Sequence, residues 1–278
     1  MPLERAPGLL IAVAGSDPSG GAGLQSDLQT FAAAGALGSA VPTAWTVQDG
    51  RGARAVQALA PEKVAEALSA ALGGASPGAV KVGLLPTVAL VEAVALVLAE
   101  RPHWPVVLDP VLAASAGVPL CQAGVAPALA RHLAPLTDLW TPNLPEAAEF
   151  LGCAPETVVR EPEAACRRLL ESGARAVLLK GGHGTGPDSV DWFFDGERAT
   201  TLSAPRVLGV RVRGTGCALS SWAAARLAAG DAPLEAARAA KAYVHRAIEG
   251  ALAWARTDEA VLLDRLHPLR ERENPART

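Results

Sequence analysis

Residues 9–27 read LLIAVAGSDPSGGAGLQSD, and this stretch decides the expected fold. Leu9–Ala14 is a short apolar run, which indicates a buried strand. The four glycines between Gly15 and Gly23 allow the backbone to adopt positive φ and to approach a ligand closely. A helix is predicted to begin at Gly23, and its first N–H groups are free to bind an oxygen or a ring nitrogen. Asp27, one turn into this helix, is therefore expected near the ligand.

The same alternation of short aliphatic runs and helical patterns continues along the chain. Several strand candidates are apolar throughout, which is typical of a parallel sheet covered by helices on both faces. We therefore expect a three-layer α/β/α sandwich with a mostly parallel central sheet. The strand candidates are Leu9–Ala14, Ala40–Thr46, Ala79–Gly83, Val106–Asp109, Leu139–Thr141 and Ala176–Lys180. The helix candidates are Gly23–Ala34, Pro61–Leu72, Thr87–Glu100, Ala126–Leu133, Glu146–Leu151, Pro162–Ser172, a helix to about Ala229, and Pro233–Trp254.

The C-terminal third departs from this alternation. Two strand-like runs, Ser189–Phe194 and Ala199–Ser203, flank Asp195-Gly196, a pair typical of a β-hairpin turn. No internal repeat or linker is evident, so one domain is expected over residues 1–265. The segment from Asp264 onward is charged and contains proline, so it is expected to fray, with residues 266–278 as a tail.

Composition limits the classes of function. The 278 residues carry a net charge of −3, which gives no overall attraction to nucleic acid or to an anionic membrane. The run Leu9–Ala14 is too short to span a bilayer, so neither a membrane span nor a signal peptide is predicted, and a cytoplasmic location is expected. The cysteines lack the spacing of a zinc site and, Cys217 apart, are interpreted as reduced thiols; they are Cys121, Cys153, Cys166 and Cys217. Four histidines are expected on the surface or on helices: His103, His132, His245 and His267.

A second glycine motif, Gly214-Thr215-Gly216-Cys217, opens an apolar helix. Successive backbone N–H groups at a helix start bind anions, and here they would stabilise a phosphoryl group during transfer. A thiol at a helix N-terminus has a pKa below its usual value of roughly 8.5. Cys217 is therefore expected to deprotonate or orient a substrate hydroxyl. The alternative is a small residue that only packs at the helix start.

Polar and glycine-rich segments follow most of the predicted strands. In an open α/β sheet, ligands bind beyond the carboxyl ends of the strands, where such segments come together. A catalytic cleft is therefore expected at this edge of the sheet. The strands that these segments follow end at Ala14, Thr46, Gly83, Asp109, Thr141 and Lys180.

Taken together, the motifs resemble those of the hydroxymethylpyrimidine/phosphomethylpyrimidine kinases, a family with a ribokinase-like fold. Residues 15–27, Thr141–Ala147, Lys180–His183 and Gly214–Cys217 resemble its motifs in family order. The resemblance implies transfer of phosphate from ATP to 4-amino-5-hydroxymethyl-2-methylpyrimidine, with Mg²⁺, and then to the monophosphate product. It also implies a homodimer.

The resemblance further implies roles for individual residues. The aminopyrimidine would be held by Gly15, Asp27, Gln48 and Val111. Catalysis would depend on Cys217, Gly214, Gly216 and Lys180, and the nucleotide would contact Asn143, Lys180, His183, Arg213 and Thr215. Mg²⁺, mostly through water, would be held by Asp109, Asn143 and Glu146. Without the resemblance, Asn143 and Glu146 would simply indicate a helix N-cap with an acidic residue in the first turn.

The chain departs from the family pattern at three positions near the expected site. Ser115 and Ala116 stand where the family usually has Lys and Ser, and Arg213 stands where it has His. An arginine binds phosphate but does not shuttle protons at neutral pH. We therefore expect phosphorylation of the alcohol to be retained, while the second phosphorylation stays open.

Three alternatives remain at this point. A pyridoxal kinase of the same subgroup would bind a similar flat ring that bears a hydroxymethyl group. A pyrimidine-binding homologue would have kept the fold and lost catalysis, as the altered positions suggest. A sugar kinase is disfavoured, because Cys217 stands where an Asp base would be expected.

Overall fold

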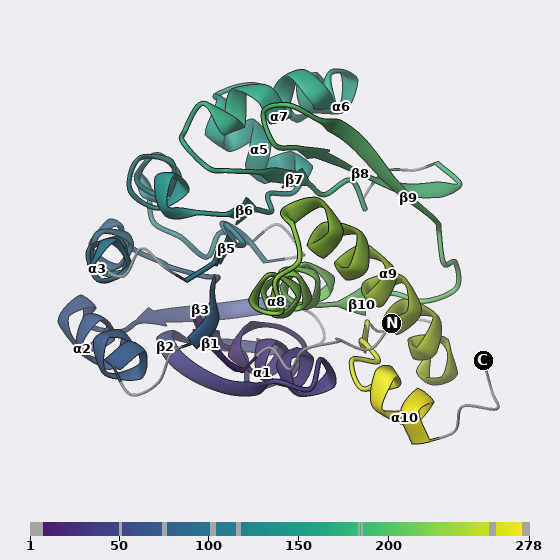
Figure 1. Cartoon of the computed structure of the whole chain (residues 1–278), viewed down its shortest axis with the longest axis horizontal. Helices are drawn as coiled ribbons and strands as arrows, with labels where there is room; N and C mark the ends of the chain where they lie inside the picture. The colour runs from purple at the N-terminus through teal and green to yellow at the C-terminus, as the bar shows by residue number, and fades with distance from the viewer. Residues whose placement is uncertain are drawn as a thin grey trace.

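The computed structural model describes residues 8–49, 52–73, 77–100, 104–114, 118–182, 184, 186–255 and 260–273. The predictions made for His103, Ser115, Ala116 and His183 lie outside these residues. The chain forms three layers, with a nine-stranded sheet in the order β3-β2-β1-β4-β5-β6-β7-β8-β9 between two layers of helices (Figure 1). The predicted α/β/α sandwich is confirmed.

The sheet is parallel in its centre and antiparallel at both edges. Parallel pairing joins β2, β1, β4, β5, β6 and β7, whereas β3 and the hairpin β8–β9 run antiparallel to their neighbours. The strands are β1 Leu9–Ser16, β2 Leu37–Asp49, β3 Gly52–Ala58, β4 Pro77–Val82, β5 Val106–Leu108, β6 Leu139–Trp140, β7 Val177–Leu179, β8 Asp188–Phe194 and β9 Ala199–Pro205. A separate parallel pair joins β10 Val212–Arg213 to β11 Val261–Leu262.

Alternating residues of the central strands enter two different cores. Ile11 and Val13 of β1 pack with one layer of helices, and Leu10 and Ala12 pack with the other. This is why the strands are apolar on both faces. The first layer holds α2 Pro61–Gly73, α3 Val88–Ala99, α4 Val125–Ala128, α5 Leu144–Leu151, α6 Pro155–Arg160 and α7 Pro162–Leu170. The second layer holds α1 Gly23–Ala33, α8 Thr215–Ala228 and α9 Pro233–Ala251 (Figure 1).

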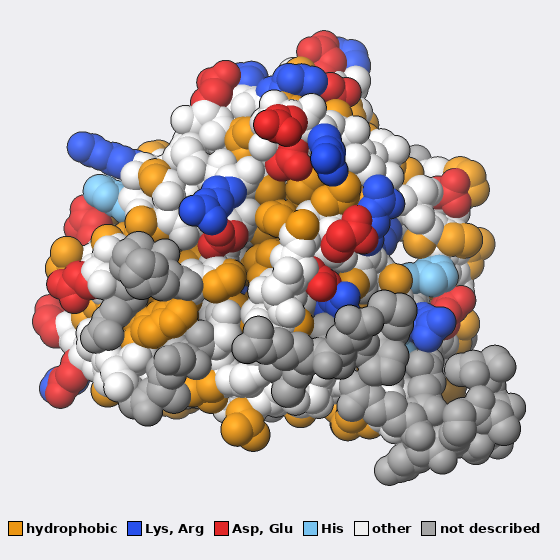
Figure 2. Space-filling view, viewed as in Figure 1, with side chains coloured by type: hydrophobic (Ala, Val, Ile, Leu, Met, Phe, Trp, Pro, Cys, Tyr) orange, Lys and Arg blue, Asp and Glu red, His pale blue; other side chains and the backbone are white. Residues whose placement is uncertain are grey.

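Every predicted strand and the predicted hairpin are present, but β3, α6 and the short pair β10–β11 were missed. The β3 sequence contains little large apolar surface, and its second half is mostly exposed, so it carries no strong pattern. The predicted helix Ala126–Leu133 is a four-residue helix followed by a π-helical turn over Leu129–Leu133. Among the described residues, none of the helices combines the length and hydropathy that a bilayer span needs. On the face drawn in Figure 2, acidic and basic side chains are interspersed.

The prediction that the chain frays from Asp264 is wrong for the next few residues. Asp264, Arg265 and His267 are buried, and α10 His267–Glu273 follows. Asp264 N–H donates to the Ala247 carbonyl at 3.1 Å, and the Tyr243 hydroxyl donates to the Arg265 carbonyl at 2.9 Å. The His267 ring is buried and stacks on Tyr243, and His267 is the first residue of α10, so the expectation of a surface or helix residue holds there for the helix alone. The charged composition of this segment suggested fraying, because it does not show that α9 supplies hydrogen-bonding partners for the segment.

Candidate active site

The loop between β1 and α1 is held by its own hydrogen bonds. Both oxygens of the Asp17 carboxylate are used, because Oδ1 accepts from Ser19 N–H at 2.9 Å and Oδ2 from Ala22 N–H at 2.8 Å. Gly23 has φ +56°, and a Cβ on it would lie 2.3 Å from the Gly15 carbonyl oxygen. The loop therefore folds back onto the end of β1 in a way that requires glycine at position 23.

The two glycine motifs lie against one another, as the sequence predicted. Gly214 is the N-cap of α8 with φ +77°, and a Cβ on it would lie 1.9 Å from the Gly21 carbonyl oxygen. The free N–H groups at the start of α8 thus face the loop that follows β1. These motifs are almost 200 residues apart in sequence, so this contact is a property of the tertiary fold.

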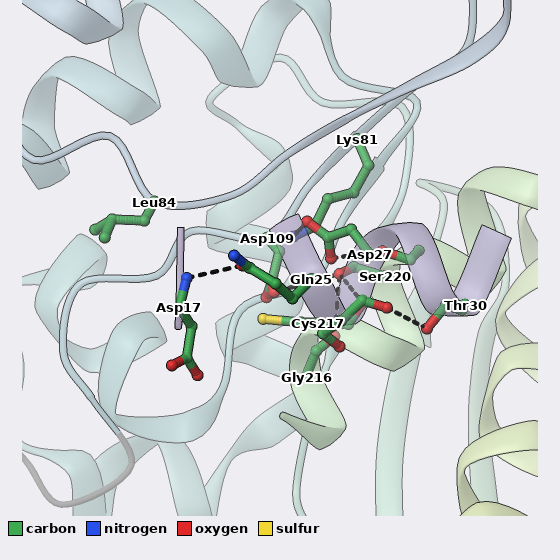
Figure 3. Close-up of polar contacts among 12 residues, drawn as sticks. Asp17, Gln25, Asp27, Thr30, Lys81, Leu84, Asp109, Gly216, Cys217 and Ser220 are labelled. Atoms are coloured by element: carbon green, nitrogen blue, oxygen red, sulfur yellow. Dashed lines mark hydrogen bonds and ion pairs between the residues drawn. The ribbon is translucent and has the colours of Figure 1, made fainter. Parts of the chain in front are cut away.

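Cys217 lies in the first turn of α8, and its sulfur points between the first loop and Asp109 (Figure 3). The Gly23 N–H hydrogen-bonds to this half-buried thiol. Burial raises the pKa of Cys217 to about 11, and the nearby Lys81 only partly opposes that shift. The expectation of a lowered pKa is therefore wrong, because desolvation of the thiolate outweighs the helix terminus and the cation.

Below Cys217 lies a fully buried ion pair, here called the inner pair. Lys81 Nζ is 3.0 Å from Asp27 Oδ2, and neither side chain is exposed to solvent. The Ser221 hydroxyl donates to Asp27 Oδ1 at 2.8 Å. Both carboxylate oxygens bind protein groups and Asp27 has no exposed surface, so its contact with the pyrimidine stays a prediction.

The pKa values of both members of the inner pair are raised, which disfavours the charge on Asp27 and favours the charge on Lys81. Burial raises the pKa of the Asp27 carboxyl despite Lys81, which would favour its neutral form. For Lys81, burial alone would lower the pKa, but Asp27, Cys217 and Asp109 raise it above its ordinary value. We favour the ionised pair, because a neutral Asp27 would leave Lys81 as a buried cation without its carboxylate partner.

A second ion pair, here called the outer pair, lies beside Ser220 of α8. Lys180 Nζ is 2.6 Å from Asp109 Oδ1, and the Ser220 hydroxyl donates to Asp109 Oδ2 at 3.2 Å. Burial alone would lower the pKa of Lys180, but Asp109 and Glu146 raise it, so the ammonium stays charged. A Cβ on Gly216 would lie 3.2 Å from Lys180 Nζ, so glycine lets this cation approach the start of α8.

Asn143 and Glu146 form a reciprocal capping box at the start of α5. Glu146 N–H donates to Asn143 Oδ1 at 2.9 Å, and Asn143 N–H donates to Glu146 Oε2 at 2.8 Å. Burial raises the pKa of Glu146 to about 7, although Lys180 opposes the shift. The interpretation of Asn143 and Glu146 as a helix N-cap with an acidic first turn is thus correct for their side chains. Glu146 Oε1 takes no part in the capping box.

The carboxylates of Asp109 and Glu146 suit a hard cation such as Mg²⁺. In the described parts of the chain, no group of three or more His, Cys, Asp or Glu side chains surrounds a common metal position. The residues therefore fit a Mg²⁺ ion that keeps most of its water and binds mainly through phosphate oxygens, and they do not form a protein cage.

The remaining predicted residues lie around this centre. Arg213 Nη2 is 3.4 Å from Asp17 Oδ2, so Arg213 is paired with the first loop. Gln48 is half-buried near the end of β2, beyond Thr46, whose hydroxyl donates to the Ser16 carbonyl at 2.9 Å. Val111 follows Asp109 and is half-buried. Thr215, also half-buried, is the first residue of α8.

Gly15 lies at the end of β1, where a Cβ would lie 2.9 Å from the Leu84 side chain. Two hollows of the described surface are lined by other residues, although the first includes Pro145, next to Glu146. One, of about 430 Å³, lies between α5 and α6, and the other, of about 240 Å³, lies beside Trp192 and Thr200. The cleft expected at the carboxyl ends of the strands stays a prediction, and the site is defined by its polar groups.

Four residues of this site were missed in the sequence. Lys81 gave the clearest signal, because a lysine within the apolar run Ala79–Gly83 must have a partner if that run is a buried strand. Ser220 and Ser221 gave none, since serine is common in helices and only the packing of α8 brings each hydroxyl to an aspartate. Arg265 was missed because the segment from Asp264 was expected to fray.

Comparison with known proteins agrees with this site. The family described as phosphomethylpyrimidine kinase matches residues 17–261. A hydroxymethylpyrimidine/phosphomethylpyrimidine kinase from Rhizobium meliloti is 40% identical over 243 residues, which cover 87% of this chain and 91% of that protein. A thiamine biosynthesis bifunctional protein from Geobacter sulfurreducens is 42% identical over 250 residues, or 88% of this chain, and the chain spans 50% of that relative's length.

A solved structure shows the same likeness. The ADP complex of Bacillus subtilis pyridoxal kinase superposes with a TM-score of 0.80 and 32% identity, covering 87% of this chain and 91% of that one. The ribokinase-like fold implied by the motifs is thereby confirmed.

Proposed function

The chain belongs to the phosphomethylpyrimidine kinase family, and we propose that it transfers the γ-phosphoryl group of ATP to the hydroxymethyl oxygen of 4-amino-5-hydroxymethyl-2-methylpyrimidine. The relatives confirm the predicted kinase class. The observation that carries the proposal is the convergence of Cys217, Lys180 and the start of α8 on the loop after β1.

In this reaction the substrate oxygen forms a bond to the γ-phosphorus, and the bond from that phosphorus to the oxygen bridging the β- and γ-phosphates of ATP breaks, so that ADP leaves with this oxygen. The hydroxyl proton is released to water. Negative charge spreads over the transferring oxygens. The N–H groups at the start of α8 and the Lys180 ammonium lie close enough together to stabilise that charge jointly. When bound, Mg²⁺ offsets the charge of the phosphates, with Asp109 and Glu146 holding its water ligands.

Cys217 is proposed to orient the substrate hydroxyl and not to act as a thiolate formed in advance. A thiol whose pKa is raised to about 11 is almost wholly neutral at pH 7. It can still accept a hydrogen bond from the hydroxyl while the proton leaves. The position of the sulfur beside Asp109 and the first loop suits this role (Figure 3).

Steady-state ATP consumption with the aminopyrimidine and Mg²⁺ tests the proposal. We expect turnover by the wild type and a loss of roughly a hundredfold in kcat for Cys217→Ala, since it loses the group that aligns the hydroxyl. Cys217→Ser keeps a hydrogen-bonding group and should lose less. Tight binding of the pyrimidine by the wild type without ATP turnover would instead favour the binding-protein alternative.

Pyridoxal phosphorylation is the second candidate, because the pyridoxal kinase of Bacillus subtilis has the same fold at 32% identity. The Rhizobium meliloti relative, which is named for the pyrimidine reaction, is more similar in sequence, at 40%. Parallel assays on pyridoxal and the aminopyrimidine discriminate between the two. A higher kcat/KM on pyridoxal would reverse the assignment.

The second phosphorylation is proposed to be weaker than the first. Arg213 is paired with Asp17, and the usual Lys and Ser are replaced at positions 115 and 116, so fewer groups are available for the more anionic monophosphate. The kcat/KM should therefore be lower on the monophosphate than on the alcohol. Equal values would contradict this part of the proposal.

Four properties remain predictions: Mg²⁺ dependence, a homodimer, a single domain over residues 1–265, and a cytoplasmic location. The chain spans 50% of the length of the bifunctional relative, so a second activity is not carried over from that relative to this chain.

A further inference from the structure

The Arg265 side chain lies between the two glycine motifs and binds both. Its Nη2 donates to the Gly21 carbonyl at 2.5 Å and approaches the Arg213 carbonyl, which directly precedes Gly214, at 3.5 Å. Its Nη1 donates to the Gly20 carbonyl at 3.3 Å. One guanidinium thus contacts the loop that follows β1 and the segment that leads into the start of α8.

The contact is close enough to determine the spacing of the two motifs. A Cβ on Gly214 would lie 2.6 Å from Arg265 Nη2 as well as 1.9 Å from the Gly21 oxygen. The guanidinium, Gly21 and Gly214 therefore pack directly against one another, without space for a side chain at position 214. A displacement of Arg265 would change the distance between the first loop and the N–H groups of α8.

Arg265 is an unusual residue to bury for stability alone. It is 2% exposed, and among the described residues its acceptors are the neutral oxygens of Gly20, Gly21, Gln29 and Arg213. Its buried Nε has no partner there. Burying a cation without a carboxylate partner costs free energy, and neutral carbonyls offset only part of this cost. Such an arrangement is expected where the geometry it imposes has a use.

The backbone of Arg265 is itself fixed from two sides. The Tyr243 hydroxyl of α9 donates to its carbonyl, and the Tyr243 ring stacks on Trp222 of α8 at 3.9 Å between centroids. Upstream, β11 pairs with β10, so Val261 N–H donates to the Arg211 carbonyl at 2.8 Å. The C-terminal segment therefore runs beside the strand that precedes Gly214 and presents Arg265 from a rigid support.

We propose that Arg265 is a positioning residue for phosphoryl transfer, which holds the loop after β1 at a fixed distance from the anion-binding start of α8. This inference rests on the kinase function proposed above. Arg265 binds the two loops and not the reacting atoms. It acts on the reaction by setting the positions of these loops. Its charge adds a positive potential behind the N–H groups that face the phosphoryl group.

The test is a comparison of kcat and KM in Arg265→Met. The first loop keeps its own hydrogen bonds around Asp17, so KM for the aminopyrimidine should stay within about threefold of wild type. Misalignment of the loop with α8 should lower kcat roughly ten- to a hundredfold. Arg175→Met is the matched control, since Arg175 is an exposed arginine paired with Asp138, and it should leave kcat unchanged.

Two further measurements separate positioning from stability. Circular dichroism and a thermal melt give the folded fraction of each variant at the assay temperature, and kcat is expressed per folded enzyme. In Arg265→Ala, added guanidinium ion should restore part of kcat, whereas ammonium at equal ionic strength should not. If Arg265→Met does not fold, Arg265→Lys replaces it, with an expected loss of about tenfold because an ammonium lacks the planar fork that reaches both loops.

Wild-type kcat in folded Arg265→Met or Arg265→Lys would overturn the proposal, and so would a loss of kcat that only follows the unfolded fraction. A wild-type protein without ATP turnover would instead overturn the proposed function.

Discussion

The inner and outer pairs have the same chemistry in two different settings. Each joins one aspartate to one lysine from segments far apart in the chain, and each aspartate also accepts from one of two consecutive serines of α8. Lys81 and Asp27 have no exposed surface, whereas the Lys180 side chain is 13% exposed and lies beside Gly216 and the start of α8. The inner pair therefore supports the site, and the outer pair is open to a ligand.

This difference teaches that residue type alone does not separate support from catalysis. An ion pair that has lost all contact with solvent cannot exchange a partner for a phosphate without unfolding its surroundings. A partly exposed pair can, because its lysine needs only a small movement to reach an oxygen at the helix start. Each of the four predictions below tests one side of this contrast.

The largest expected effect is on stability, from Lys81→Met. It leaves Asp27 as a buried carboxylate without its cation, which costs about 3–5 kcal/mol in the free energy of unfolding. Urea denaturation followed by circular dichroism measures the change. Lys63→Met, which removes an exposed lysine paired with Glu66, is the control and should change nothing measurable. Wild-type stability in Lys81→Met would remove the distinction between the two pairs.

The next largest effect is on catalysis, from Lys180→Met. Loss of a cation aimed at the transferring phosphoryl group should lower kcat roughly 10²–10³-fold. Stability should fall less than in Lys81→Met, because water can reach Asp109 where Lys180 is partly exposed. Steady-state kinetics and the same denaturation assay give both numbers. If Lys180→Met changed the free energy of unfolding by more than it changed the activation free energy calculated from kcat, the outer pair would have the supporting role.

The thiol between the two pairs provides the third prediction. Because the pKa of Cys217 is raised to about 11, its alkylation by iodoacetamide at pH 8 should be roughly a hundredfold slower than that of an unperturbed cysteine peptide. The rate should rise about tenfold per pH unit up to pH 10, as the thiolate forms. Mass spectrometry resolves this site from the other three cysteines. Fast labelling at pH 7 would restore the lowered pKa expected from the sequence.

The smallest effect is expected from the two serines. Ser221→Ala removes a donor to a fully buried carboxylate, which should cost about 1–3 kcal/mol of stability with little change in kcat. Ser220→Ala should instead lower kcat a few-fold and cost less stability, because Asp109 keeps Lys180. Denaturation and kinetics on this matched pair check the contrast. The opposite pattern would reverse the roles of the pairs.

The sequence predicted the outline of the fold and much of the site, and the reasons are local. Apolar strand runs and helix starts follow from patterns within about ten residues, which is why β1, α1 and the hairpin β8–β9 were predicted near their observed positions. The strand β3 was not predicted, because its sequence lacks an apolar pattern. The buried Arg265 was not predicted either, because its partners are distant in sequence. The resemblance of the motifs to those of the kinase family also predicted that Lys180, Asp109 and Cys217 belong to one site, and the structure brings these three residues close together.

The sequence by itself determined which residues this protein brings to its site: two glycine stretches, a thiol, and the lysine and carboxylates that accompany them. The tertiary structure alone decided how they act. It paired Lys81 with Asp27 and Lys180 with Asp109, left the Cys217 thiol half-buried, and placed Arg265 between Gly21 and Gly214. Charge state, solvent access and spacing depend on groups that are close in space but far apart in the chain, so local sequence does not contain them.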